Sequence, residues 1–208
     1  MTVPSHLRYS GRSPQSQRAA LEGIVRASPL LMEVLEALRE IDLPDWLLVS
    51  GAVYNLAWNV LTDRPPLTGI KDVDVVYFEP ADLSYEAEDR VIRRLAERFA
   101  HLPLPVEVRN QARVLLWFPE KFGQPFAPLT SSAEMLERYA SKTHAVGVRL
   151  LADDSLRIVA PFGLDDLFSF RMVPNPALSN RPAHEAKAAR AKAIWPELTI
   201  VPWPADTP

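Results

Sequence analysis

The chain has 208 residues, of which 48% are hydrophobic and 24% are charged. This balance is typical of a globular protein and excludes wholesale disorder, a collagen repeat and a coiled coil. A formal net charge of -3 argues against a protein that coats nucleic acid, because such proteins carry a strongly basic surface. The sequence contains no cysteine, which excludes disulfides, a thiolate nucleophile and a cysteine zinc site.

The N-terminal residues contain arginine but lack the apolar core and cleavage site of a secretory signal. Nor does any stretch approach the roughly eighteen consecutive apolar residues that mark a membrane-spanning helix. We therefore expect a cytoplasmic protein with no membrane partner. Residues 1–15 are polar and contain proline, and we expect them to form a flexible arm that folds over the body. Residues 16–208 are expected to form a single domain.

The first elements along the chain are helical. Apolar residues recur at helical spacing over residues 17–41, and a Ser-Pro pair at 28–29 predicts two helices or one broken helix. Residues 45–51 are an apolar run ending in small residues, which predicts a buried strand that turns directly into a helix over 51–61. A loop rich in proline and glycine over 65–69 follows.

The middle of the chain alternates strands and helices. Residues 72–78 alternate acidic and apolar side chains at strand spacing. Ser84 is a predicted N-cap for a helix that continues to about residue 99. Residues 105–109 predict a third strand, and residues 112–118 a fourth, before a proline-rich loop.

The C-terminal part adds a hairpin and a helix. Ser132 is expected to cap a short helix, and the segments 144–151 and 156–159 flank a turn that predicts a hairpin. A short helix follows Gly163, a longer helix covers about 183–194, and the last residues pack as a strap. These elements predict an α/β (α+β) fold in which a central mixed β-sheet is flanked by helices.

Two carboxylates stand out in the second strand. Asp72 and Asp74 are two residues apart and therefore point to the same face, while Val73 and Val75 point into the core. Adjacent like charges favour a cation between them, and oxygen ligands without imidazole or thiolate favour Mg²⁺ or Mn²⁺. Glu107, a lone acid in the next strand, would complete the site from a neighbouring position.

An isolated Asp-x-Asp is more often a solvated strand face. Here the interpretation as a metal site is favoured, because the pair lies in a β-branched run and follows the Ser50-Gly51 turn. A strand that ends in small residues and opens a helix presents free N–H groups and the positive end of the helix dipole to a phosphate. Such a turn can also be purely steric.

Several basic and polar residues are weaker candidates. Arg109, Asn110 and Arg113 follow Glu107 closely and are either phosphate or acceptor contacts or an exposed strand edge. Lys71 and Lys142 could offer positive charge to a bound phosphate, but solvated lysines are the more frequent case.

Two other groups are interpreted as structural. Asp165 and Asp166 follow Gly163 at a helix start, where N-capping accounts for at least one of them. The five tryptophans are too dispersed to form a base-stacking platform and are assigned to the core and the strap.

The sequence resembles the polymerase-beta-like nucleotidyltransferase superfamily over residues 48–108, where the small-residue turn, the Asp-x-Asp strand and a third acidic strand occur in order. Over about 46–203 it is similar to a family of bacterial nucleotidyltransferase-like proteins of undetermined substrate. The resemblance rests on four segments: Ile70–Phe78 (IKDVDVVYF), Val106–Val114 (VEVRNQARV), Ala145–Arg149 (AVGVR) and Ala160–Leu167 (APFGLDDL).

The resemblance implies that Asp72, Asp74 and Glu107 bind the metal ions and that Ser50-Gly51 faces the phosphates. It implies transfer of a nucleoside monophosphate from a triphosphate such as ATP to an acceptor, with release of pyrophosphate. The chain departs from the family pattern in the reversed order of Ser50-Gly51. It also carries Tyr54 and Leu115 where close relatives have a basic residue and a histidine.

The sequence alone leaves open the identity of the acceptor and two alternatives to an active enzyme. The acceptor is a small molecule, a protein or an RNA end, and the acidic balance favours the first two. A catalytically inactive nucleotide-binding regulatory or sensor module is the second hypothesis, motivated by the departures at Ser50-Gly51 and Tyr54. In a third, the acids face water and serve no site. The sequence does not predict the oligomeric state.

Overall fold

A computed structural model describes residues 4–205 of the chain. The helices are α1 (Pro14–Arg26), α2 (Pro29–Ile41), α3 (Gly51–Leu61), α4 (Tyr85–Arg98), α5 (Val114–Phe122), α6 (Ser132–Leu136), α7 (Asp165–Phe168) and α8 (Arg181–Ile194). The strands are β1 (Leu47–Val49), β2 (Val73–Tyr77), β3 (Val106–Asn110), β4 (Gly147–Leu150), β5 (Leu156–Val159), β6 (Arg171–Met172) and β7 (Thr199–Ile200). Short 3-10 helices cover Ser5–Leu7, Gln111–Arg113 and Lys142–His144.

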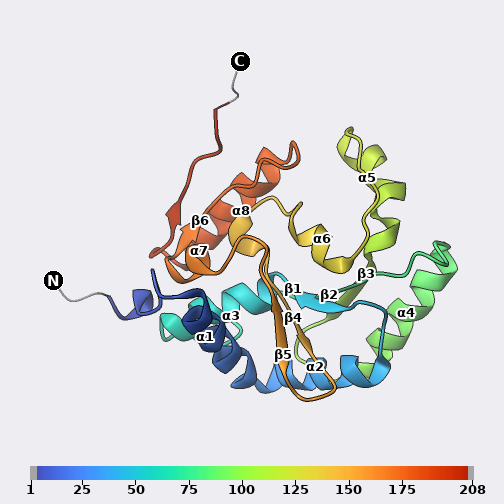
Figure 1. The fold of residues 1–208 in the computed structure, drawn as a ribbon, viewed down its shortest axis with the longest axis horizontal. Helices are drawn as coiled ribbons and strands as arrows, with labels where there is room; N and C mark the ends of the chain where they lie inside the picture. Colours follow the sequence, from blue (N-terminus) through green and yellow to red (C-terminus); the bar gives the residue numbers. More distant parts are fainter. Residues whose placement is uncertain (1–3, 206–208) are drawn as a thin grey trace.

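The main sheet has five strands in the order β3-β2-β1-β4-β5. The β2–β3 pair is parallel and the other pairs are antiparallel, so the sheet is mixed, as predicted. The strands β4 and β5 form the predicted C-terminal hairpin. Figure 1 shows α1, α2 and α3 on one side of β1 and β2, and α6 and α8 on the other side. The α+β prediction is therefore confirmed.

Helices α1 and α2 are separate, and their start signals lie in the sequence. Each begins with proline directly after a serine, and the side chains of Ser13 and Ser28 accept hydrogen bonds from the N–H groups of Ser16 and Leu31. Proline fits the first helical position because an N–H at that position would have no partner within the helix. The predicted interruption at residues 28–29 is thus a boundary between two helices, which together with α3 cover the larger core.

The prediction of a fourth strand over residues 112–118 was wrong, because this segment forms a 3-10 turn and then α5. The Asn110 side chain accepts a hydrogen bond from the N–H of Ala112 and so starts a helical turn. Val114 and Phe118, four residues apart, are buried, whereas Leu116 and Trp117 are exposed. Burial therefore follows the helical period, which a short apolar run does not reveal by itself.

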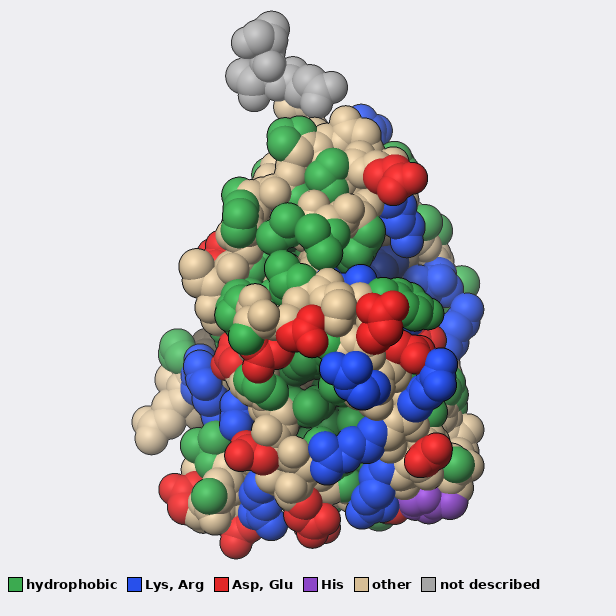
Figure 2. All heavy atoms as spheres, turned by 90° about the vertical axis from the view of Figure 1, so that its right-hand side faces the viewer, with side chains coloured by type: hydrophobic (Ala, Val, Ile, Leu, Met, Phe, Trp, Pro, Cys, Tyr) green, Lys and Arg blue, Asp and Glu red, His purple; other side chains and the backbone are tan. Residues whose placement is uncertain are grey.

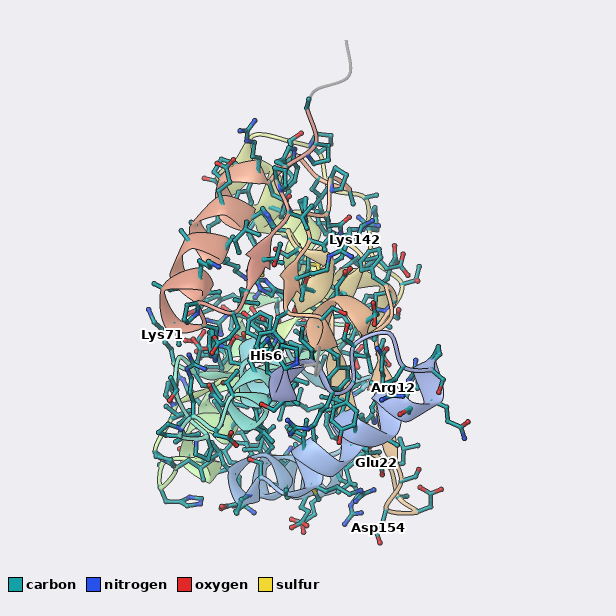
Figure 3. The ribbon with its side chains drawn as sticks, turned by 90° about the vertical axis from the view of Figure 1, so that its left-hand side faces the viewer. His6, Arg12, Glu22, Lys71, Lys142 and Asp154 are labelled. Carbon is teal, nitrogen blue, oxygen red and sulfur yellow. The ribbon has the colours of Figure 1, made fainter. Side chains whose placement is uncertain are left out.

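The N-terminal segment contacts the body through α7. The N–H of Gly11 donates to a carboxylate oxygen of Asp165 at 2.7 Å, and the Gln17 amide donates to the same oxygen at 2.8 Å. His6, labelled in Figure 3, lies edge-on to Phe170 with 4.9 Å between ring centroids. Residues 1–3 of the expected arm lie outside the described residues.

The expectation that Asp165 or Asp166 caps a helix was wrong. The N-cap of α7 is Leu164, and no side chain caps it. Asp165 instead holds the N-terminal segment, and Asp166 lies 3.6 Å from Arg171. A short helix after Gly163 is confirmed, as is the short helix α6. The prediction that Ser132 caps α6 was wrong, because the N-cap is Ser131, whose side chain accepts a hydrogen bond from the N–H of Glu134.

The C-terminal helix and strap are confirmed up to residue 205. After α8 the chain turns at the buried Trp195, whose indole N–H donates to the Asn59 side chain at 3.1 Å. Strand β7 then pairs with β6 in a small parallel sheet. Residues 206–208 lie outside the described part of the chain. Among the described helices, none combines the length and the apolar character needed to cross a membrane.

Candidate active site

The predicted acids lie on two adjacent central strands. The parallel register of β2 and β3 places Asp74 opposite Glu107, and the antiparallel register of β1 and β2 places Asp74 opposite Val49. Paired positions on neighbouring strands share a face of the sheet. Val73 and Val75 belong to the larger core on the opposite face. The alternation predicted for this strand is therefore present, and it directs Asp74 and Glu107 to the face that carries α6 and α8.

Asp72 lies one residue before β2, at the end of a loop that α3 holds in place. The Asn59 amide donates to the carbonyls of Pro66 and Thr68 at 2.9 and 2.8 Å, and Asn55 donates to the carbonyl of Gly69 at 3.2 Å. Two buried amides on one apolar helix thus satisfy three loop carbonyls. This arrangement fixes the chain just before Asp72.

The turn between β1 and α3 contains a backbone conformation that favours glycine. Ser50 has φ 63° and ψ -132°, a combination that side chains other than glycine rarely adopt. Its N–H donates to the carbonyl of Val146, and its carbonyl accepts from Val53 and Tyr54. A serine rather than a glycine holds this position, so the Ser50-Gly51 order costs backbone strain here. Such strain is often found at functional sites.

Replacing Ser50 with glycine is expected to raise the free energy of unfolding by about 1 kcal/mol, because glycine adopts this conformation without strain. The check is the urea midpoint of the purified variant. Ser50→Ala is the matched control, since alanine removes the hydroxyl but keeps the strain and should give no gain. Equal stability of the glycine and alanine variants would contradict this account.

Gly51 leaves the start of α3 open. A Cβ added at Gly51 would meet only the Asn55 amide nitrogen at 3.4 Å and the Tyr54 hydroxyl at 4.0 Å. These are ordinary contacts, so the fold does not require glycine here. With no side chain at Gly51, an anion in the adjoining space could approach the first N–H groups of an eleven-residue helix, where the helix dipole favours it.

A cavity of about 220 Å³ lies between this turn and α8. We call it the polar cavity; its lining includes Ser50, Gly51, Tyr54, Asn55, Lys71, Asp72, Asp74, Lys187, Arg190 and Trp195. Two cations of α8 therefore face two carboxylates of the β2 edge across one small space. Lys71 also lines this cavity, whereas Lys142 does not. Figure 3 shows Lys71 beside one end of α8 and Lys142 well away from it.

The polar cavity shifts the proton affinities of its walls. Burial, together with the negative charge of Asp72, raises the pKa of Asp74 to about 6, while Lys187 opposes this rise. Burial lowers the pKa of Lys187 below the ordinary lysine value, and the charge of Asp74 partly restores it. A partly buried carboxylate and a partly buried ammonium thus line the same cavity, where each compensates the charge of the other.

Aromatic and imidazole rings support the floor of the cavity. Tyr54 stacks on His144 with ring centroids 4.2 Å apart, and both rings are buried. Burial, and then the charge of Asp74, raises the pKa of the Tyr54 hydroxyl above its ordinary value. Burial also lowers the pKa of His144 well below its ordinary value. Both rings are therefore neutral at physiological pH and contribute packing rather than charge.

A second cavity of about 600 Å³ adjoins the first and is called the aromatic cavity. It is formed by β3, α5, α6 and the beginning of α8; its lining includes Glu107, Arg109, Trp117, Phe118, Lys121, Phe122, Met135, Arg138 and Tyr139. Ser50, Asp74 and Lys187 line both cavities. The two spaces therefore meet at the central carboxylate.

The other predicted contacts have different surroundings. Arg109 lines the aromatic cavity, and its guanidinium lies 3.7 Å from the Glu107 carboxylate. The Asn110 side chain also borders this cavity, but it is hydrogen-bonded to the backbone of Glu79 and Ala112. Arg113 forms an ion pair with Glu88 and lines neither cavity. The structure thus brings Arg109 to the site and uses the polar atoms of Asn110 and Arg113 in local structure.

The carboxylates provide suitable donors for a hard cation, although they are not gathered into a ready-made site. Within residues 4–205, no three His, Asp or Glu side chains converge closely enough to hold a metal ion. The Glu107 side chain is half exposed, and its carboxylate lies 3.7 Å from the Arg109 guanidinium. Burial, and then the charge of Asp72, nevertheless raise the pKa of Asp74 although Lys187 opposes the rise, so the two carboxylates still repel each other. Such a pair fits a divalent cation.

Two functional candidates were not predicted. Lys187 and Arg190 are more than 100 residues from Asp72 and Asp74 in sequence, and they lie on an alanine-rich helix with several other basic residues. Only the packing of α8 over the sheet edge singles them out. The tryptophan assignment also needs correction, because Trp117 is 41% exposed and lines the aromatic cavity rather than the core.

The comparisons with known proteins agree with this geometry. A family described as nucleotidyltransferase matches residues 36–200. A similar solved structure is an NMR structure described as revealing a CCA-adding enzyme head domain. Its TM-score is 0.71, the sequence identity is 27%, and the match covers 89% of this chain and 96% of the other. No curated protein matches the sequence.

The family match spans the turn, both acidic strands, the hairpin and α8, so it includes every element of the candidate site. The similar structure has the same fold over nearly its whole length. Both findings support nucleotidyl transfer as the activity. The chain belongs to the nucleotidyltransferase family.

Proposed function

We propose that this nucleotidyltransferase uses Mg²⁺ or Mn²⁺ to transfer a nucleoside monophosphate from a triphosphate to an acceptor, and that pyrophosphate is released. The observation that carries the proposal is the register of Asp74 with Glu107 beside the Ser50-Gly51 turn, facing Lys187. Carboxylates for a cation, N–H groups for phosphate and a lysine for added charge thus surround one small space. A cytoplasmic location fits the use of a triphosphate.

Asp72 and Asp74 are the residues that would hold the metal ions, with Glu107 as the third carboxylate. When bound, the metal would neutralise phosphate charge and lower the proton affinity of the attacking hydroxyl. Burial, together with the neighbouring charge of Asp72, raises the pKa of Asp74. Its carboxylate therefore has the most to gain from a cation.

The triphosphate has its partners on two elements. The free N–H groups at the start of α3 suit phosphate oxygens, and Gly51 allows the oxygens to approach the backbone. Lys187 and Arg190 face this turn from α8. Positive charge on both sides of the polar cavity would orient the triphosphate and stabilise the departing pyrophosphate.

The acceptor proton has a candidate receiver. Glu107 borders the aromatic cavity beside Asp74 and is half exposed, so its carboxylate can contact both solvent and an acceptor hydroxyl. The Arg109 guanidinium lies 3.7 Å from this carboxylate and can hold it at the edge of the sheet. We assign Glu107 the role of base in addition to that of metal ligand.

Replacing Lys187 with glutamine is expected to weaken triphosphate binding about tenfold or more, because one charge-assisted contact contributes roughly 1.5–3 kcal/mol. Isothermal titration with Mg²⁺ and each of the four triphosphates measures the effect. Lys187→Arg should recover most of the affinity because it retains the charge.

Lys142→Gln is the matched control for this loss of charge. Lys142 lies over Phe162 and lines neither cavity, so its replacement should leave the affinity unchanged. An equal loss in both variants would show that net charge, rather than the position of Lys187, controls binding.

The experiment that tests the proposed function directly is release of pyrophosphate from each triphosphate, with and without Mg²⁺. We expect slow release with water as acceptor, dependent on the metal and on one preferred triphosphate. Triphosphate binding without any release, in the presence of varied acceptors, would instead identify a sensor module.

A further inference from the structure

We infer that the aromatic cavity binds the acceptor, and that the acceptor is a small hydroxyl compound with an apolar ring and an anionic group. This inference rests on the proposed function, since it names the second substrate of the same site. The acceptor class follows from three properties of the cavity: its place beside the carboxylates, its aromatic wall and its unpaired cation.

The first property is position. The aromatic cavity includes Asp74 and Glu107, and it meets the polar cavity at Ser50, Asp74 and Lys187. Gly51, at the opening of α3, borders only the polar cavity. A triphosphate held at Gly51 and a ligand in the aromatic cavity would therefore meet at Asp74, where a hydroxyl is needed.

The second property is the aromatic wall of α5. Trp117 and Phe122 are 41% and 47% exposed, and Phe118 packs between them at centroid distances of 6.0 and 4.6 Å. Figure 2 shows hydrophobic side chains gathered on the upper part of this face, where α5 lies in Figure 1. Exposed aromatic groups that line a concave site are typical of a pocket for an apolar ligand.

The third property is positive charge beside these rings. The Lys121 ammonium lies 5.4 Å from the ring centroid of Trp117 and 5.5 Å from that of Phe122. Across residues 4–205 it has no carboxylate partner, whereas Arg109 and Arg138 each have one. A ligand that stacks on the rings would place an anionic substituent near Lys121. This substituent would neutralise the charge of the Lys121 ammonium.

Size and overall charge favour a small molecule over a nucleic acid end. A volume of about 600 Å³ lies within the range of small-molecule pockets, roughly 300–1,000 Å³. Binding of a polynucleotide depends on a track of cations along its phosphates, whereas this chain has a net charge of -3. The aromatic wall would therefore contact a single ring system rather than a stacked strand.

The transfer balances without another reactant. The acceptor oxygen forms a bond to the α-phosphorus of the triphosphate, and the bond from that phosphorus to the bridging oxygen breaks. Pyrophosphate leaves with the bonding electron pair, and the acceptor proton passes to the Glu107 carboxylate. The products are a phosphodiester of the acceptor and pyrophosphate.

The first test uses anilinonaphthalene sulfonate, an anionic aromatic probe whose fluorescence rises in apolar sites. We expect it to bind wild type together with the triphosphate, and to bind Trp117→Ala about tenfold more weakly. Lys121→Ala should bind the probe several-fold more weakly than wild type. Leu116→Ala is the matched control, because Leu116 is 51% exposed on the same helix but does not line the cavity, and this variant should bind normally.

The second test adds acceptors to the pyrophosphate assay: 4-hydroxyphenylacetate, an oligoribonucleotide with a free 3′ hydroxyl, and a tyrosine-containing peptide. We expect at least a tenfold rise in release only with the anionic phenol, lost in Trp117→Ala and kept in Leu116→Ala. Stimulation by the oligoribonucleotide or peptide instead would overturn the inference.

Two further outcomes separate the acceptor from the nucleotide. If Trp117→Ala weakens triphosphate binding as much as probe binding, the aromatic cavity holds the nucleotide base and the inference is wrong. If wild type shows neither triphosphate binding nor release of pyrophosphate while the probe still binds, the proposed function fails, and the acceptor assignment fails with it.

Discussion

Asp74→Asn is expected to lower nucleotidyl transfer by about three orders of magnitude, because metal-assisted charge neutralisation contributes several kcal/mol to the transition state. Asp74 lies where both cavities meet, in register with Glu107. Asparagine has nearly the same shape but carries no charge. The loss should appear in pyrophosphate release with saturating Mg²⁺ and triphosphate, and activity within a few-fold of wild type would contradict the role of Asp74.

The same variant should be more stable than wild type when no metal is present. Since burial and the charge of Asp72 raise the pKa of Asp74 to about 6, the folded protein holds this proton more tightly than the unfolded chain does. The free energy of unfolding therefore falls as the pH rises from 3.8 to about 6 and stays low above that.

Asparagine cannot ionise, so the metal-free variant should gain about 2 kcal/mol at pH 7.5. Urea unfolding in the presence of a chelator measures this gain. It should shrink when both proteins are unfolded near pH 4, where wild-type Asp74 is protonated. A gain that is independent of pH would show that asparagine stabilises the fold by other contacts.

Glu107→Gln is expected to lower the rate of transfer by about 10²–10⁴-fold, the usual contribution of a positioned base, while triphosphate binding changes little. The reason is position, since Glu107 borders the aromatic cavity but not the polar cavity. Parallel measurements of pyrophosphate release and calorimetric binding separate the two effects.

Arg109→Gln provides the control for Glu107. It removes the neighbouring cation while retaining the carboxylate, and should cause a smaller loss of rate. If Glu107→Gln retains both binding and full activity, Glu107 is neither base nor metal ligand. If wild type itself binds triphosphate but transfers nothing, the sensor interpretation replaces the enzyme.

The acids could be predicted from sequence because strand alternation is a local signal. Two acids at positions two apart, within a β-branched run, must share a face, and Val73 and Val75 must take the other. The partner strand could be proposed from Glu107 and its apolar neighbours. The register that aligns it with Asp74 is a tertiary property, set by packing of α4 and the sheet, and needed the structure.

The cationic side of the site could not be predicted in this way. Lys187 and Arg190 line the polar cavity, and their orientation depends on how the buried Trp195 anchors the end of α8. Similarly, residues 112–118 contain an apolar run that is compatible with a strand or a helix. The hydrogen bond from the N–H of Ala112 to the Asn110 side chain favours the helical turn. Because this segment was predicted as a strand, the aromatic wall that Trp117 and Phe122 form on α5 was not predicted.

The most direct test of the central claim is thermal and urea unfolding of wild type and Asp74→Asn with each triphosphate, with and without Mg²⁺. A single preferred triphosphate should stabilise wild type by about 2.7 kcal/mol at a hundredfold excess over its dissociation constant, only with metal. The variant should show no such gain. Equal stabilisation of both proteins, or a response that does not need metal, would contradict a metal-nucleotide site at Asp74.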